Sequence, residues 1–112
     1  PAQPVKDYDI PESVCCRLPV SNPRLRNVID KFLQQLSDWL VDIEGDVQGK
    51  EFERIVKFAY WLRGAAGSVG FDAFTEPAKD LEAQASGKQF DEVRHTIEVI
   101  KTLSARIDLN AA

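Results

Sequence analysis

The sequence predicts an all-α domain: an antiparallel up-down-up-down four-helix bundle preceded by an extended or partly helical N-terminal arm. Three observations predict this fold class. Apolar residues recur at three- and four-residue spacing in four successive segments after residue 21. The connections between these segments are short, roughly two to six residues, which favours antiparallel neighbours. No segment alternates like a strand, and no internal repeat is present.

The first predicted helix begins at Asn22. An asparagine there can accept hydrogen bonds from the free N–H groups of the first turn, and Pro23 suits the first helical position. Gly45 and Gly49 predict a short break at its end. Its apolar residues follow one buried face, namely Leu25, Val28, Ile29, Phe32, Leu33, Leu36, Leu40 and Ile43.

The second helix is predicted from about Lys50 to Val69. Gly70 follows it directly, and glycine readily takes the left-handed conformation that ends a helix. We therefore expect Gly70 to terminate this helix.

The third helix follows at once, with Asp72 as its candidate cap. Either its first turn holds Pro77 or its regular part starts near Thr75, because proline disrupts a helix interior. Its stripe continues through Ala78, Leu81 and Ala85, and Ser86-Gly87 ends it. The fourth helix has its apolar residues on one face, namely Phe90, Val93, Ile97, Ile100, Leu103 and Ile107.

Residues 1–20 differ in character from the bundle. Four prolines interrupt them, and their apolar residues have no sustained period. We expect a linker or arm with a short helical turn around Glu12 to Arg17, acting as an ordered tether from an upstream domain rather than as a docking arm for a partner. The predicted division is therefore an arm at residues 1–20 and a bundle at 21–112.

Composition limits the functions that this chain can have. At 112 residues with 44% apolar content, one domain with one core is expected. The net charge of −4 argues against nucleic acid as the main partner. No apolar run approaches the roughly 18 residues of a membrane span, and no signal peptide is evident.

The two cysteines, Cys15 and Cys16, are adjacent. Neighbouring cysteines rarely bridge each other, and two are too few for a disulfide framework or a four-ligand zinc site. We therefore expect a cytoplasmic protein with no metal or cofactor. The chain lacks methionine, including a start, so a piece of a longer protein is expected.

The second helix carries glycines on the side where a buried helix does not need them. At 100° per residue, the core face comprises Phe52, Ile55, Ala59, Leu62, Ala66 and Val69. The opposite side carries Glu53, Lys57, Tyr60, Gly64 and Gly67, with Arg63 on the flank between the two. An interior glycine costs roughly 1 kcal/mol relative to alanine, so bare backbone on this side requires an explanation.

Three explanations for these glycines remain open. They are incidental, or they admit another helix of the same bundle, or they allow a partner's surface to approach the backbone beside Tyr60. In the last case Arg63 lies near enough to meet an anion, and a basic side chain beside exposed backbone suits a phosphoryl group or an acidic pocket.

The same segment resembles the signature helix of histidine phosphotransfer (HPt) domains, whose pattern is roughly His-x-Leu-Lys-Gly, then small residues, then Gly. Here the run is Tyr60-Trp61-Leu62-Arg63-Gly64, followed by Ala65-Ala66-Gly67-Ser68-Val69-Gly70. Leu81-Glu82 matches the Leu-Glu of the family's next helix. The resemblance covers about residues 20 to 108, essentially the whole folded part, and is similar to C-terminal HPt modules of multidomain sensor kinases and response regulators, where Phe71-Asp72-Ala73-Phe74 and Pro77 have counterparts.

The resemblance implies roles for Arg63 and Gly64 but not for the phosphoryl acceptor. In HPt domains the histidine takes a phosphoryl group from a receiver-domain aspartate and passes it to another. By resemblance, Arg63 stands where a lysine helps neutralise the phosphoryl charge, and Gly64 leaves room for the receiver's loops. The acceptor does not carry over, because Tyr60 occupies its position.

Tyrosine is a poor replacement for that histidine. Neutral imidazole offers a free lone pair at pH 7, whereas a tyrosine hydroxyl, with an ordinary pKa near 10, is only about 0.1% phenolate there. The motif supplies no neighbouring histidine or carboxylate as an obvious general base. A tyrosine phosphate is also a more stable ester than the N–P bond of phosphohistidine, so it would not readily return its phosphoryl group.

Other chemistry-bearing residues have ordinary explanations. His95, the sole histidine, lies in the fourth helix with no second His or Cys at metal-ligand spacing, so we interpret it as a solvated helix residue. Trp39 and Trp61 could anchor a partner, but aromatics on bundle helices are more often partly buried packing.

Three hypotheses about function remain. The first is a degenerate HPt domain that binds a receiver domain without transferring phosphoryl, in a bacterial two-component pathway. The second is an active phosphotransfer domain in which Tyr60 is an engineered substitution or another residue accepts. The third is a structural or dimerisation bundle. Under the first, the partners are a response-regulator receiver and neighbouring domains of a larger signalling chain, and the isolated domain is monomeric. The domain itself makes no membrane contact, although the full-length protein could tether it to a membrane sensor kinase. The partner-binding residues are Lys57, Tyr60, Trp61, Arg63, Gly64 and Gly67.

Overall fold

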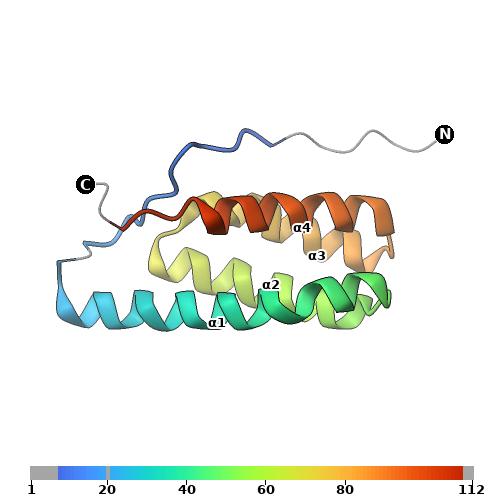
Figure 1. Cartoon of the computed structure of the whole chain (residues 1–112), viewed down its shortest axis with the longest axis horizontal. Helices are drawn as coiled ribbons and strands as arrows, with labels where there is room; N and C mark the ends of the chain where they lie inside the picture. The colour runs from blue at the N-terminus through green and yellow to red at the C-terminus, as the bar shows by residue number, and fades with distance from the viewer. Residues whose placement is uncertain (1–7, 20, 110–112) are drawn as a thin grey trace.

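The computed structural model describes residues 8–19 and 21–109, and the parts of the predicted arm at 1–7 and 20 lie outside them. Four α-helices and one 3-10 turn follow in chain order: α1 (Pro23–Gln48), α2 (Phe52–Val69), η1 (Asp72–Phe74), α3 (Thr75–Ser86) and α4 (Phe90–Ala105). The described residues contain no strand, only one isolated bridge. Successive helices run antiparallel (Figure 1). The predicted all-α four-helix bundle is confirmed.

Two helix ends form as the local sequence predicts. The Asn22 side chain accepts hydrogen bonds from the backbone N–H groups of Arg24 and Leu25, with Pro23 beginning α1. Gly70 ends α2 in the left-handed conformation, at φ 85°, and its N–H donates to the Ala66 carbonyl. Both ends are set by residues within one turn, which explains why the sequence was sufficient to place them.

The predicted break near Gly45 is wrong. Helix α1 continues through Gly45 to Gln48, and the chain turns only at Gly49 and Lys50. The last turn is held by packing, because Val47 is buried and Asp46 accepts a 2.9 Å hydrogen bond from Nε of Arg54 at the start of α2. These long-range contacts outweigh the modest helix propensity of one glycine.

The third helix begins differently from the prediction in one respect. Asp72 does not cap it: the carboxylate of Asp72 accepts from Arg17 of the arm, and α3 has no side-chain cap. A 3-10 turn at Asp72–Phe74 precedes the regular helix, which begins at Thr75 with Pro77 in its first turn. Both predicted alternatives are therefore correct: the regular helix starts at Thr75, and its first turn contains Pro77.

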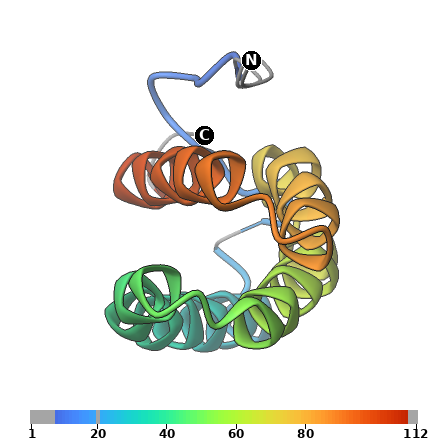
Figure 2. The same cartoon turned by 90° about the vertical axis from the view of Figure 1, so that its right-hand side faces the viewer.

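The helices form an arc when viewed end on (Figure 2). Helix α2 packs closely against both α1 and α3, and α3 also packs against α4, whereas α1 and α4 meet more loosely across the open side. An aromatic cluster fills the centre between α1, α2 and η1. Phe32 stacks on Trp61 at 5.5 Å and on Phe71 at 5.4 Å between ring centroids, and Trp39 lies 5.5 Å from Phe58.

The described part of the arm is extended and packs on the bundle (Figure 1). Val14 is buried; its N–H donates to the Arg106 carbonyl, and its own carbonyl accepts from Asp108. The N–H of Arg17 donates to the Gly70 carbonyl at 2.9 Å. The predicted helical turn around Glu12 to Arg17 is wrong, since these backbone groups bond to distant segments instead of to one another.

Candidate functional site

Helix α2 has a buried face and an exposed one. The buried face consists of Ile55, Phe58, Ala59, Leu62, Ala66 and Val69, each at most 3% exposed. The exposed side, which we call the outward face, comprises Lys57, Tyr60, Gly64 and Gly67, of which only Gly67 is partly covered. Tyr60 is the most exposed aromatic residue of the described chain, at 66%. The residues that the sequence predicted for the two sides fall on them, with two differences in the core.

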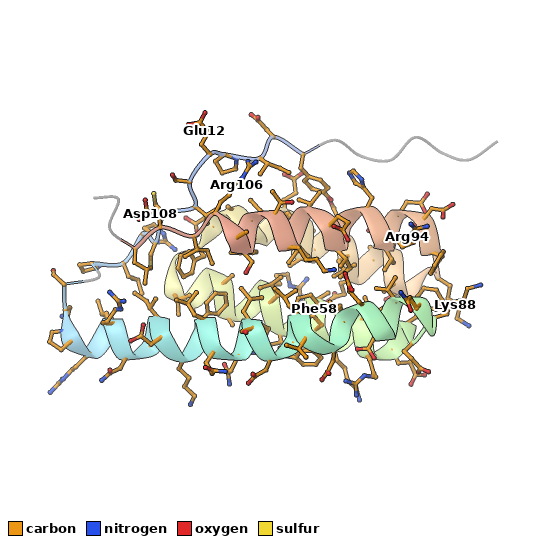
Figure 3. All side chains as sticks on the ribbon, viewed as in Figure 1. Glu12, Phe58, Lys88, Arg94, Arg106 and Asp108 are labelled. Carbon is orange, nitrogen blue, oxygen red and sulfur yellow. The ribbon has the colours of Figure 1, made fainter. Side chains whose placement is uncertain are left out.

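Those differences concern the two phenylalanines of α2. Phe52, predicted in the core, is only half-buried at the helix start, whereas Phe58 (labelled in Figure 3) is fully buried. The Phe58 ring packs against Trp39. The predicted core face did not include Phe58, although idealised helical geometry puts it only about 20° around the helix from Val69. The Trp39 ring of α1 covers Phe58, so the buried side of α2 includes this residue.

The glycines of the outward face have no neighbour in the bundle. A Cβ added at Gly64 or at Gly67 would meet no other part of the described chain within 4 Å. The explanation that these glycines admit another helix of the same bundle is therefore excluded for the described residues. They are either incidental or kept open for something outside this chain.

Gly70 differs from these two. Its φ is +85°, and an added Cβ would lie 2.9 Å from Cβ of Arg17 and 3.0 Å from its backbone nitrogen. Glycine is required there both by the left-handed turn and by the close passage of the arm. The fold itself therefore explains the glycine at position 70, whereas it does not explain those at 64 and 67.

Arg63 is positioned between two neighbours of the outward face. Its guanidinium carbon lies 5.6 Å from the centroid of the Tyr60 ring, a cation–π contact. Its Nη1 lies 3.5 Å from Oε1 of Glu82 on α3, and both side chains are partly exposed. The other carboxylate oxygen of Glu82, Oε2, is buried and has no hydrogen-bond partner among the described residues.

A shallow groove of about 440 Å³ runs beside Tyr60 between α2 and α3. Val56 forms an apolar part of its wall, and its polar lining comes from Lys57, Tyr60, Glu82 and Ser86. The groove is open to solvent along its length. No described residue forms a hydrogen bond with the Tyr60 hydroxyl, so no general base is already positioned against it.

Trp61 and His95 lie away from the outward face. Trp61 stacks on Phe32 and contacts Trp39, so most of its ring is engaged in packing, as the sequence favours, and any contact with a partner stays a prediction. His95 is half-buried rather than fully solvated, in a groove between α1 and α4 that also contains Glu44 and Lys101. Helix α4 does not pack directly against α2. Within residues 8–19 and 21–109, no cluster of side chains could hold a metal ion.

Sequence reasoning missed two residues at this site. Glu82 was noted as part of a motif but not as a neighbour of Tyr60 and Arg63. The sequence offered one indication that Glu82 lies near Tyr60: it follows 22 residues later, on the next antiparallel helix. Arg17 reaches the Gly67 carbonyl from the arm, with Nη2 at 3.5 Å. No periodicity in the arm could have placed it there.

Comparison with known proteins agrees with this geometry. The Hpt domain family matches residues 27–108, most of the chain. No curated protein and no solved structure matches it. The chain belongs to the Hpt domain family, whose members are phosphotransfer carriers rather than true enzymes and interact with response-regulator receiver domains. Membership gives it a role in the phosphorelays of two-component signalling. None of its described helices is long and apolar enough to cross a membrane.

Proposed function

We propose that this domain is a pseudo-HPt module, which binds a response-regulator receiver domain but does not relay phosphoryl groups. The observation that carries the proposal is the outward face of α2. By its resemblance to the family's signature helix, Tyr60 stands where those domains have the acceptor histidine. It is 66% exposed and lies beside two glycines at which an added Cβ would meet no other part of the described chain within 4 Å. The face is accessible, and its reactive nitrogen is missing.

The chemistry of Tyr60 supports the loss of transfer. The described residues place no hydrogen-bonded base against the Tyr60 phenol, so this domain gives the hydroxyl no help in losing its proton as it attacks phosphorus. The carboxylate that lines the groove beside Tyr60, that of Glu82, is ion-paired to Arg63, which in turn lies against the Tyr60 ring. The second oxygen of Glu82 has no hydrogen-bond partner, but no described bond links it to the Tyr60 hydroxyl.

The retained glycines support binding. Each interior glycine on an exposed helical face weakens the helix by roughly 1 kcal/mol, without any packing benefit inside the described bundle. A partner that approaches the backbone closely gives these positions a reason to lack side chains. Lys57 lies on this face and Arg63 on its flank, and both suit a partner with an acidic surface.

Such a module would act by occupying a receiver, either competing with a true HPt domain for it or positioning domains within a larger signalling chain. In this proposal residues 1–20 connect the bundle, residues 21–112, to upstream domains, and the module works in the cytoplasm. The isolated domain is monomeric.

The test is a calorimetric titration of the chain with a panel of receiver domains, each with and without the phosphate mimic beryllofluoride. We expect at least one receiver to bind, and Gly64→Trp to abolish that binding because the indole would block the outward face. The melting temperature of the variant controls for folding. A structural bundle with no receiver partner would bind none of the panel. An active carrier would acquire label from a receiver charged with radiolabelled acetyl phosphate.

A further inference from the structure

The N-terminal arm brings a second guanidinium to the end of the outward face. Nη2 of Arg17 lies 3.5 Å from the Gly67 carbonyl, and its Nε lies 3.1 Å from Oδ2 of Asp72. The Arg17 side chain is 64% exposed. Lys57, Arg63 and Arg17 therefore follow one another along α2, over about 15 Å from residue 57 to residue 67.

The backbone, rather than the ion pair, fixes Arg17 in this place. Its N–H donates to the Gly70 carbonyl at 2.9 Å, and the preceding Cys16 donates from Sγ to the Val69 carbonyl at 2.8 Å. The absence of a side chain at Gly70 lets the arm pass this closely. The Arg17–Asp72 pair is exposed on both sides, and such pairs contribute little to stability.

We propose that Arg17 is part of the receiver-binding surface, so that this surface is composed of α2 and the arm together. The inference rests on the proposed function. The occupant is the acidic active-site pocket of a receiver domain, because Arg17 adds a third cation to Lys57 and Arg63, which lie on either side of the exposed glycines. Binding exchanges the solvent-exposed Asp72 carboxylate for the receiver's carboxylates, which are desolvated at the contact and attract the guanidinium more strongly.

The experiment uses the whole 112-residue chain and the receiver domain that binds it in the panel titration. Arg17→Gln removes the charge while keeping a polar stem, and Arg17→Glu reverses it. The matched controls are Arg94→Gln and Arg94→Glu, which change the net charge equally. Arg94 is an exposed residue near the start of α4. It lies at the opposite end of the bundle from Arg106, whose carbonyl bonds to Val14 of the arm (Figure 3). Circular dichroism melts verify that all four variants fold.

We expect Arg17→Glu to weaken receiver binding about tenfold at low ionic strength, with a smaller loss for Arg17→Gln. The difference in receiver affinity between the Arg17 variants and the unaltered chain should shrink at high salt, where exposed charges are screened. The Arg94 variants should bind within about twofold of the unaltered chain.

The outcomes separate this inference from the function on which it rests. If Gly64→Trp abolishes binding while the Arg17 variants bind like the unaltered chain or like the Arg94 variants, the composite surface is refuted and receiver binding stands. If no receiver binds the unaltered chain, both proposals fail.

Discussion

Gly64→Ala should make this domain more stable and a poorer partner at the same time. Gly64 lies inside α2, and a Cβ added there would touch no other part of the described chain within 4 Å. The substitution therefore brings the helix-propensity gain without strain, about 1 kcal/mol in the free energy of unfolding. For a domain of this size, that corresponds to a rise of roughly 4 °C in melting temperature.

The same methyl group should interfere with a surface packed against the bare backbone. Overpacking a tight contact by one methyl costs about 1–3 kcal/mol, which weakens binding roughly 5- to 150-fold. Thermal melts and calorimetric titration with the bound receiver measure the two effects on one protein sample.

Gly45→Ala is the matched control for this experiment. Gly45 is also inside a helix with nothing within 4 Å of an added Cβ, but it lies on α1. It should give the same gain in stability and leave receiver affinity unchanged. A Gly64→Ala variant that is stabilised yet binds as well as the unaltered chain would refute the argument that this glycine is kept for docking.

Two further predictions follow from the geometry of α2. Gly70→Ala should destabilise the domain by about 2–4 kcal/mol in a urea titration, because it combines a left-handed backbone with a 2.9 Å approach to Cβ of Arg17; a loss below about 0.5 kcal/mol would contradict the close packing of the arm. Tyr60→His should acquire label from a phosphorylated receiver, because it returns an exposed imidazole beside Arg63 and Glu82. If that variant folds and binds the receiver but stays unlabelled, more than the acceptor has been lost.

The fold was largely predictable because its determinants are local. The spacing of apolar residues defines each helix. Asn22 determines the start of α1, and Gly70 the end of α2, through contacts within a single turn. The errors arose where distant segments decide the outcome. Asp46 is held by Arg54 and keeps α1 helical past Gly45, and Asp72 bonds to the arm instead of capping α3.

The candidate site also contains residues that local geometry places and residues that only contacts between distant segments place. Tyr60, Gly64 and Gly67 share a face because helical geometry requires it, so the sequence could place them together. Glu82 comes from another helix, and Arg17 from an aperiodic arm held by backbone bonds at Gly70. Contacts between elements of this kind have no signature in a single sequence, and they required the structure.

The most direct test of the account is one mixture: the unaltered chain, the receiver that binds it, and radiolabelled acetyl phosphate. We predict a complex in which the receiver carries the label and this domain, separated from it afterwards, carries none. Radiolabel on the unaltered domain would contradict the claim that it binds receivers without relaying phosphoryl groups.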